Sequence, residues 1–259
     1  MNEVLCLRSV AIAFDRGRDR VVALQDISLS VGEGEIVSVI AGPSQGKTTL
    51  LRIASGLLPP DHGVVSVGGV TMTGLRDRQR QRILARDIGL AMGSGPATMR
   101  SSVREYVELK AAAPKNGSLR LFSRQERRHM TRAVLDQLEI GDCADMRWQD
   151  ISDWQRTLVE LAQAMVVSPR LLLIDDLGCA FGLRQKQTIM AFLEDFVQTQ
   201  RSGVLMAVSD DDSALRSVRI WRLNRRRLTL LANDTAGDLD PQADVIPMRR
   251  ADAGGGAGW

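Results

Sequence analysis

The N-terminal part of the chain alternates between apolar and polar side chains. Two stretches, 3–14 and 21–31, follow this pattern and are rich in β-branched residues, and the polar segment from Asp15 to Arg20 separates them. Alternation with a period of two is typical of strands that bury one face. We therefore predict a strand pair joined by a polar turn, which forms an antiparallel β portion at the N-terminal side of the fold.

Later apolar runs are continuous instead of alternating. Leu171 to Ile174 is wholly apolar, as expected of a strand buried on both faces of a parallel sheet. Turn residues at the ends of other short runs mark further strands. These strands are predicted at 35–40, at 64–67, after Gly68-Gly69, at 88–92 and at 204–208.

Helical patterns fill most of the segments between these strands. Predicted helices cover 50–54, 77–86, 102–140 with a polar interruption from Ala113 to Ser118, about 155–167, and 184–200. Strands that alternate with helices in this order predict an α/β fold with a parallel-sheet core.

The composition changes near the C-terminus. From about residue 233 the chain is rich in Asp, Ala, Pro and Gly, and we expect 233–259 to be a disordered tail. The 259 residues of the chain are enough for one large α/β domain or two small ones. We assign 1–232 to one domain.

Charge gives no reason to expect a nucleic-acid partner. The net charge is only +3, from 34 basic and 31 acidic residues. Arginines cluster at 76–86, 124–132 and 222–227, but none of the ten aromatic residues interleaves with them as a base-stacking platform requires. We interpret the clusters as solvated helix faces and loop charges. The alternative is contact with nucleic acid or lipid headgroups.

The cysteines show neither metal-ligand nor redox spacing. Cys6, Cys143 and Cys179 are an odd number, and no signal peptide precedes them, so we expect free thiols in a reducing cytoplasm. No apolar stretch approaches the roughly 18 residues that a membrane span needs. Any role at a membrane therefore has to come through a partner.

The segment from Ile40 to Thr49 has the layout of a phosphate-binding P-loop. Gly46-Lys47-Thr48 follows the predicted strand 35–40 and precedes a helix-like run. In such a loop, backbone N–H groups and a helix N-terminus point at an anion. Lys47 adds a positive charge, and the Thr48 hydroxyl can reach Mg²⁺.

The glycines of this loop depart from the strict pattern. Ala41 stands where that pattern has its first glycine, five residues before Gly46, and Ser44 stands where the family that the chain resembles, named below, has a later glycine. A left-handed backbone at either residue costs about 1 kcal/mol. Alternatively, Gly42-Pro43-Ser44 is the usual opening of the loop, which has then lost one residue before Gly46. Both alternatives are open on sequence alone.

Two acidic residues follow the apolar run 171–174. In P-loop NTPases one carboxylate at a strand end holds Mg²⁺, and the next acidic residue can polarise the attacking water. Asp175 and Asp176 occupy these two positions.

Taken together, these motifs resemble those of the ATPase subunits of ATP-binding-cassette (ABC) transporters. The resemblance covers about residues 3–230, and it implies a P-loop core with a helical subdomain at about 94–156. It is most specific in Gly46 to Leu57, in Pro60 to Gly63 with Gly68-Gly69, and in Leu161 to Ala164 ahead of 171–176. The opening Val21 to Leu29 is similar to the branch that serves lipoprotein release, macrolide export and cell division.

The resemblance implies ATP and Mg²⁺ as cofactors, and it assigns site residues. Phe14 is expected to stack on adenine, with a strand-core Phe as the alternative. Thr48 and Asp175 are expected to hold the metal ion, and Asp176 and Ser209 to serve catalysis. The other nucleotide contacts are expected from Ala41, Gly42, Ser44, Gly46, Lys47, Thr48 and Thr49, and from Ser152 and Gln155 of the signature motif.

The signature motif reads Ile151-Ser152-Asp153-Trp154-Gln155 in this chain, where the family has Leu-Ser-Gly-Gly-Gln. Ser152 and Gln155 match. Asp153 places a negative charge near the γ-phosphate that the motif meets across the family's dimer, and Trp154 adds bulk where close approach is needed.

Further departures lie in the coupling and catalytic loops. Gly93 stands where the family has the glutamine that senses Mg²⁺, and Gly182 where it has the aspartate that joins the two active sites. Asp176 replaces the catalytic glutamate, and Ser209 replaces the switch histidine. A misplaced carboxylate can cost about 10²-fold in rate.

We therefore expect an ATP-binding subunit of an ABC transporter that couples to an integral-membrane permease. Its hydrolysis is expected to be weak or to depend on a second, competent cassette in a head-to-tail dimer. This places the chain in the cytoplasm, peripheral on the inner face of the cell membrane. The alternative is a non-hydrolysing pseudo-ATPase that acts as a scaffold or regulator. A soluble kinase or GTPase on the same loop fits worse, because no base-specificity motif supports it and 102–167 stays unexplained.

Overall fold

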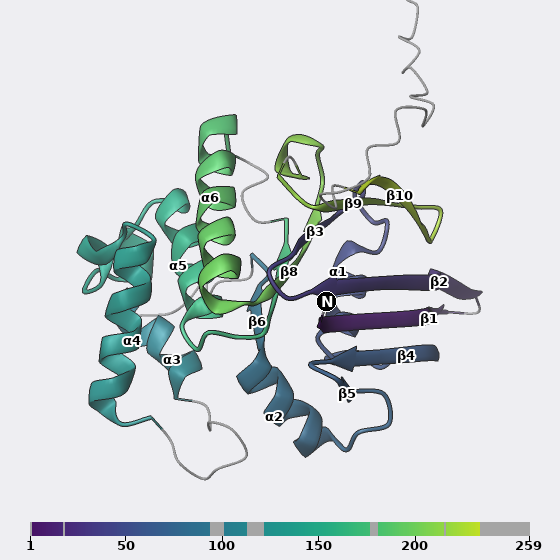
Figure 1. Cartoon of the computed structure of the whole chain (residues 1–259), viewed down its shortest axis with the longest axis horizontal. Helices are drawn as coiled ribbons and strands as arrows, with labels where there is room; N and C mark the ends of the chain where they lie inside the picture. The colour runs from purple at the N-terminus through teal and green to yellow at the C-terminus, as the bar shows by residue number, and fades with distance from the viewer. Residues whose placement is uncertain are drawn as a thin grey trace, which may run out of the picture.

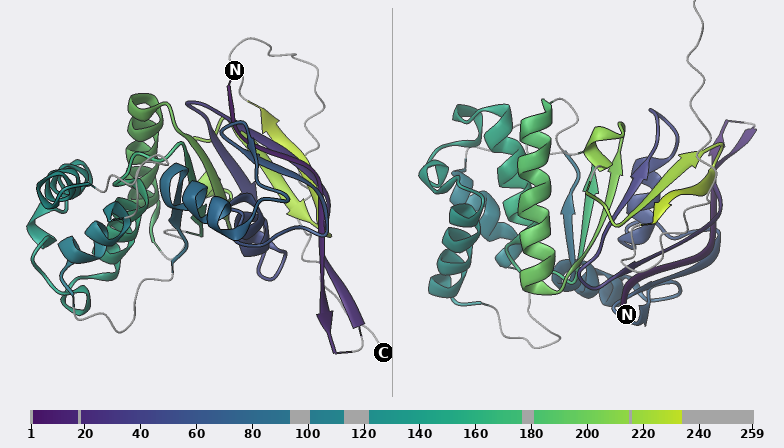
Figure 2. Two further views of the ribbon diagram at one scale, coloured as in Figure 1. Left: turned by 90° about the horizontal axis from the view of Figure 1, so that it is seen from below. Right: turned by 45° about the horizontal axis from the view of Figure 1, so that its top comes forward.

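The computed structural model describes residues 2–17, 19–93, 101–112, 122–176, 181–214 and 216–233. Within these ranges the chain forms a smaller sheet, a larger sheet and a group of helices (Figure 1). Two further views show the larger sheet lying between the smaller sheet and most of the helices (Figure 2). This is the predicted α/β architecture, with a parallel-sheet core and an antiparallel β portion.

The smaller sheet is antiparallel and contains the predicted N-terminal strand pair. Its strand order is β2-β1-β4-β5, and its strands are β1 (Glu3–Arg16), β2 (Asp19–Gly32), β4 (His62–Val67) and β5 (Val70–Thr71). The pair β1–β2 is longer than predicted. Asp15 pairs with Arg20 and Arg16 with Asp19, so most of the predicted polar turn is strand.

The larger sheet has the strand order β10-β9-β3-β8-β7-β6. Its strands are β3 (Ile36–Ile40), β6 (Ile88–Ala91), β7 (Leu171–Asp175), β8 (Gly203–Val208), β9 (Arg219–Asn224) and β10 (Arg227–Asn233). All neighbours pair in parallel except β9 and β10, which form an antiparallel hairpin at one edge. This hairpin was not predicted from the sequence.

The six α-helices of the described residues agree with the predicted helical segments to within a few residues. They are α1 (Lys47–Ala54), α2 (Asp77–Asp87), α3 (Val103–Ala111), α4 (Arg124–Gln137), α5 (Asp153–Met165) and α6 (Leu183–Gln200). Three of them begin at a capping box, in which a serine and a residue three positions later bond to each other's backbone N–H. The pairs are Ser102 with Glu105, Ser123 with Glu126, and Ser152 with Gln155.

The larger sheet separates two hydrophobic clusters, because successive side chains of a strand point to opposite faces. Leu172 and Ile174 of β7 pack in the cluster that contains α3 to α6. Leu171 and Leu173 pack in the other cluster, with α1 and the smaller sheet. The apolar run 171–174 is therefore buried on both faces, as predicted.

A buried ion pair joins the edge hairpin to the centre of the fold. Both Arg219 and Glu35 are largely buried, and the guanidinium donates to both carboxylate oxygens and to Ser30 O. The Gly32 N–H also donates to the Glu35 carboxylate, at 2.7 Å. This pair holds the start of β9 against β3 and thereby sets the position of the turn after β9.

Several predictions concern residues outside the described ranges. The predicted disordered tail 233–259 lies outside them except for Asn233, which ends β10. The same holds for Cys179, for the loop that follows Gly93, and for the polar interruption from Ala113 to Ser118. Cys6 and Cys143 are free thiols, as predicted.

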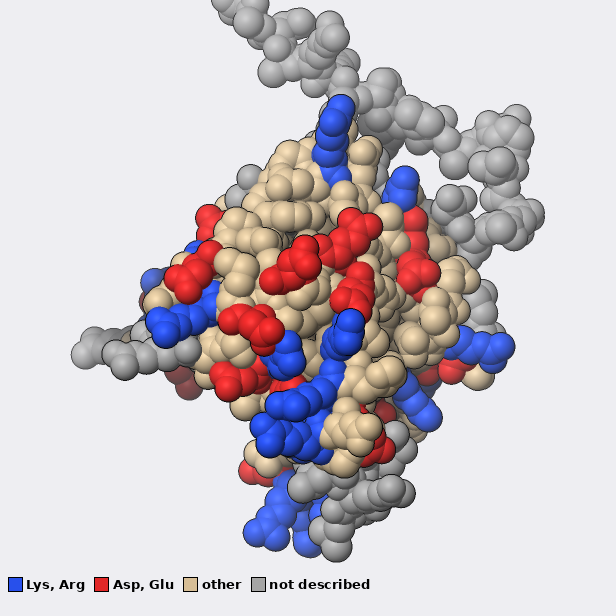
Figure 3. Space-filling view, turned by 90° about the vertical axis from the view of Figure 1, so that its left-hand side faces the viewer, with Lys and Arg blue, Asp and Glu red and all other residues tan. Residues whose placement is uncertain are grey.

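The arginine cluster at 124–132 is a solvated helix face, as predicted. It lies on α4, where Arg124, Arg128 and Arg132 are exposed. A view of the side of the molecule that carries this helix shows basic and acidic areas next to each other (Figure 3). None of the helices in the described ranges combines the length and the apolar character that crossing a bilayer requires.

Candidate functional site

The loop after β3 leaves the larger sheet later than the strict motif implies. Ala41 is buried, and its N–H donates to Val208 O at 3.0 Å, so this residue continues the β3–β8 ladder. The loop then runs from Gly42 to Gly46, and α1 begins at Lys47. This placement fits the alternative in which Gly42 opens a shortened loop.

Left-handed backbone occurs at Ser44 and Gly46 but not at Ala41. The φ angle is 58° at Ser44 and 101° at Gly46. The conformational cost of about 1 kcal/mol that we expected at either replaced glycine therefore falls on Ser44 alone. There is also little room for a side chain at Gly46. A Cβ atom added there would lie 3.1 Å from Leu24 Cδ2 and 3.3 Å from Ala23 O.

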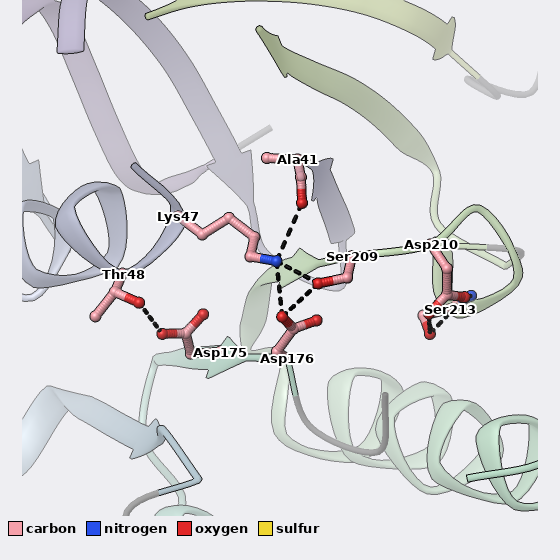
Figure 4. A network of polar contacts seen from close by, with 8 residues as sticks. All are labelled: Ala41, Lys47, Thr48, Asp175, Asp176, Ser209, Asp210 and Ser213. Carbon is pink, nitrogen blue, oxygen red and sulfur yellow. Dashed lines mark hydrogen bonds and ion pairs between the residues drawn. The ribbon is translucent and has the colours of Figure 1, made fainter. Parts of the chain in front are cut away.

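Lys47 lies at the centre of a compact polar network (Figure 4). Its ammonium donates to Ala41 O at 3.0 Å and to Asp176 Oδ2 at 2.7 Å. It also donates to Ser209 Oγ. An ammonium has three donors, and three acceptors engage them here. A phosphate can therefore bind Lys47 only if one of these acceptors gives way.

Asp176 and Ser209 complete a triangle with Lys47. Ser209 Oγ donates to Asp176 Oδ2 at 2.5 Å, and the Asp176 N–H donates to Ala207 O at 2.7 Å. Asp176 has a left-handed backbone with φ 50°. Its Oδ1 atom is buried and has no hydrogen-bond partner among the described residues. The two predicted catalytic residues are thus in direct contact, far apart as they are in sequence.

The two predicted metal ligands are also neighbours. Thr48 Oγ1 donates to Asp175 Oδ2 at 2.5 Å. A hydroxyl and a carboxylate suit Mg²⁺, which takes one or two protein oxygens and completes its shell with phosphate and water. This donor set fits the metal ion that the family implies.

A contact with α6 fixes the loop that carries Ser209. Lys186 donates to Asp210 Oδ1 at 2.9 Å, and the Ser213 N–H donates to the same atom at 2.8 Å. Burial raises the pKa of Asp210, but these hydrogen bonds outweigh it and hold the pKa below the ordinary value. Sequence reasoning did not find this anchor, which joins segments distant in the chain.

A pocket of about 590 Å³ lies beside the loop. Three segments line it: Phe14 with Val21 to Ala23, Ser44 to Thr49, and Asn224 to Arg226. Phe14 is 42% exposed, so the alternative of a strand-core Phe is wrong. The ring lines the pocket and is partly exposed, as stacking on a base requires. The third segment belongs to the arginine cluster 222–227, which sequence analysis assigned only to the surface.

The signature residues form no hydrogen bond with the Lys47 network. Ser152 caps α5 and bonds to Gln155, whose Nε2 donates to Cys143 Sγ at 2.9 Å. Asp153 is the first residue of α5 and pairs with Arg156 at 2.9 Å. Its carboxylate therefore supplies negative charge at the helix end that would attract a phosphate.

Three other positions depart from the family pattern, and at each the local structure decides whether the family residue would fit. Trp154 is helical and packs edge-on against Phe181, with ring centroids 5.3 Å apart. Gly93 has φ 63°, a conformation that glutamine adopts only with strain. Gly182 precedes α6 with extended backbone and open space around its Cα, so an aspartate would fit there.

Comparison with known proteins identifies a family. A family model described as ABC transporter matches residues 24–177. The lipoprotein-releasing system ATP-binding protein LolD of Cereibacter sphaeroides is 31% identical over 229 residues, which span 88% of this chain and 100% of that protein. The phosphonates import ATP-binding protein PhnC of Hyphomonas neptunium is 33% identical over 264 residues, spanning 96% of this chain and 95% of that protein.

Solved structures show the same fold. The dimeric bacterial ABC transporter cassette MJ0796 matches with a TM-score of 0.78 and 24% identity, over 86% of this chain and 96% of that one. A post-hydrolysis dimer of the same cassette, bound to ADP and Pi, matches with a TM-score of 0.80 and 24% identity, over 88% and 98%. The matched sequence, the fold and the phosphate-binding loop agree. The chain therefore belongs to the ABC transporter family, as one of its ATP-binding subunits.

Proposed function

We propose that this chain binds Mg-ATP between Phe14 and the P-loop. The observation that carries the proposal is the pocket of about 590 Å³, which places an exposed aromatic ring and Lys47 around one space. Thr48, which also lines it, contacts Asp175. Mg²⁺ held by Thr48 and Asp175 would neutralise phosphate charge there.

Hydrolysis by this chain alone is slow in this proposal. Asp176 is one methylene shorter than the glutamate that the family has at this position. Its carboxylate bonds to Lys47 and Ser209, so it is not free to polarise an attacking water. Ser209 has no imidazole to donate a proton or carry a positive charge. The negative charge of Asp153 weakens the electrostatic attraction between the α5 N-terminus and the ATP of a second subunit.

The chain works as a subunit, and its partners supply what it lacks. We propose a head-to-tail cassette dimer, either with a second copy or with a competent ATP-binding subunit whose signature completes this P-loop. Coupling to an integral-membrane permease would run through the region beside Gly93 and through a helical subdomain at about 94–156. The chain would then lie on the cytoplasmic face of the cell membrane. The relatives named above serve lipoprotein release and phosphonate import, so the proposal assigns no transported substrate.

Steady-state ATP hydrolysis tests this proposal. The full chain should turn over ATP at least about 10²-fold more slowly than a competent cassette, because its carboxylate and its switch residue are both altered. The double substitution Asp176→Glu with Ser209→His should raise the rate, whereas Asp176→Asn should not. A normal turnover rate for the unmodified chain alone would contradict the proposal.

A non-hydrolysing scaffold is the second candidate. One observation favours it: all three donors of Lys47 bind acceptors within the chain, so the network is complete without a phosphate. The test is Lys47→Ala in cells that depend on the chain. Unchanged function would support the scaffold, and loss of function at unchanged protein level would support nucleotide binding.

A further inference from the structure

The turn between β9 and β10 brings two arginines to the proposed nucleotide pocket. Arg225 and Arg226 line this pocket on a third side. The other two sides are the P-loop and the segment of Phe14 with Val21 to Ala23, which we call the Phe14 wall. We propose that these two guanidinium groups bind the phosphate chain of the nucleotide. The inference rests on the proposed function, and it assigns phosphate recognition to residues outside the P-loop.

Strand register brings this turn to the P-loop. Ile40, the last residue of β3, pairs with Arg222 in the parallel strand β9. Beyond this pair the two chains run on in the same direction, so Asn224 comes alongside the start of the loop at Gly42. Both residues line a second, smaller pocket of about 320 Å³ on that side of the loop. The turn therefore begins beside the loop.

Contacts with β2 fix the turn in place. The Gln25 N–H donates to Arg226 O at 2.8 Å, and Arg227 lies 3.8 Å from the Asp26 carboxylate. The segment just before these residues, Val21 to Ala23, lines the same pocket. The turn and the Phe14 wall thus belong to one connected structure.

The charges around the pocket favour an anion. Among the described residues that line it, the charged ones are Lys47, Arg225 and Arg226, and no acidic side chain is present. The neighbouring arginines of the hairpin, Arg222 and Arg227, have carboxylate partners. Arg225 and Arg226 are exposed and form no ion pair with a described residue. Exposed guanidinium groups without a carboxylate partner are suited to bind phosphate oxygens.

The backbone of the turn disfavours arginine, and yet both arginines are present. The φ angles are 46° at Arg225 and 71° at Arg226, so both residues are left-handed. Two-residue hairpin turns of this kind prefer Asn-Gly. Non-glycine residues held in a left-handed conformation are often found at functional sites. The side chains, rather than the turn geometry, therefore explain this pair.

The P-loop itself gives a reason for additional cations. The three donors of Lys47 are engaged by Ala41 O, Asp176 and Ser209. The loop between Gly42 and Gly46 also fits a shortened version of the motif. Two further positive charges in the same pocket would compensate for both features.

The test replaces Arg225 and Arg226 by the residues that the turn prefers. The double variant Arg225→Asn with Arg226→Gly should fold and keep its melting temperature or raise it. Its affinity for ATP, measured by calorimetry on the full chain in about 0.05 M salt, should fall about tenfold. At about 0.5 M salt the loss should shrink to less than about threefold, because salt screens exposed charges. The control Arg227→Ala removes a charge from the same hairpin and should leave the affinity unchanged.

Four results would overturn the inference. Unchanged affinity in the double variant would show that the arginines do not contact the nucleotide. An equal loss at both salt concentrations would show a contact other than one with phosphate. In both cases the proposed function would still stand, provided that the unmodified chain binds ATP and Lys47→Ala does not. If the unmodified chain binds no ATP, or if Lys47→Ala binds it equally well, the proposed function fails and the inference fails with it.

Discussion

The ammonium of Lys47 lies 2.7 Å from Asp176 Oδ2, and this contact joins the P-loop to the position of the catalytic carboxylate. Both side chains are mostly buried, with exposed fractions of 10% and 28%. A bound phosphate would compete with Asp176 for the same ammonium. The nucleotide site and the catalytic position are therefore coupled through one lysine.

Substitution of Asp176 by Asn should strengthen ATP binding. The amide keeps the shape of the side chain but removes the charge that competes for Lys47. We expect an affinity about fivefold higher, equivalent to about 1 kcal/mol for a partly exposed ion pair. Calorimetry on both proteins measures it. Asp211→Asn, which removes a carboxylate that pairs with Arg222 instead, is the control and should have no effect. Weaker binding in Asp176→Asn would show that the ion pair does not oppose the nucleotide.

Alanine at Gly46 should destabilise the fold, whereas alanine at Gly42 should not. Gly46 is left-handed, and a Cβ there would press on Leu24 and on Ala23 O. At Gly42 the nearest atom to an added Cβ is Gln45 Cγ, at an ordinary 3.7 Å. Urea unfolding should show a loss of about 2 kcal/mol for Gly46→Ala and less than about 0.5 kcal/mol for Gly42→Ala. Equal effects would show that the close approach of β2 does not constrain the loop.

Restoring glycine in the signature motif should increase ATP-dependent dimerisation. Asp153→Gly with Trp154→Gly removes the negative charge and the bulk from the α5 N-terminus, so a phosphate can approach. The same change loses the Trp154–Phe181 contact and helix propensity, and we expect about 2–3 kcal/mol lower stability. Light scattering with Mg-ATP measures the dimer. Ala164→Gly weakens the same helix in its last turn, far from its N-terminus, and increased dimerisation in this control would contradict the explanation.

Stability should rise with pH above about pH 8 because of Lys110. Its ammonium donates to Leu84 O and Ile88 O, which joins α3 to α2 and β6. Burial lowers the pKa of Lys110 to about 8. An unfolded lysine has a pKa near 10.4, so the unfolded chain binds more protons in this window and alkali favours the folded state.

Lys110→Met supplies the matched control for this pH dependence. Between about pH 8 and pH 10, the free energy of unfolding of the unmodified chain should rise by about 1–2 kcal/mol relative to the variant. Urea unfolding at both pH values measures the difference. Parallel pH profiles for the two proteins would show that Lys110 is not desolvated in the folded state.

The sequence predicts those strands, helices and loops whose structure depends on a local residue pattern. The buried strand β7 is apolar at 171–174, and the P-loop and its helix carry glycines and a lysine in a recognisable order. The hairpin β9–β10 escaped prediction because basic residues interrupt its apolar pattern. Its position depends on pairing with β3 and on the Arg219–Glu35 ion pair, which joins residues far apart in the chain.

The candidate site was predictable in its residues but not in its contacts. Motif order identified Lys47, Asp176 and Ser209 one by one. Their triangle depends on the parallel pairing of β3, β8 and β7, which brings the ends of these strands together. Arg225 and Arg226 looked like surface charge, because only the register of β9 places them at the pocket.

Calorimetric titration of Mg-ATP into the full chain and into Lys47→Ala tests whether this P-loop holds a nucleotide. We expect binding in the micromolar range for the unmodified chain, equivalent to about −8 kcal/mol, and loss of binding in the variant. Circular dichroism should confirm that the variant is folded. No binding by the unmodified chain, or equal binding by both proteins, would contradict the claim that this P-loop holds a nucleotide.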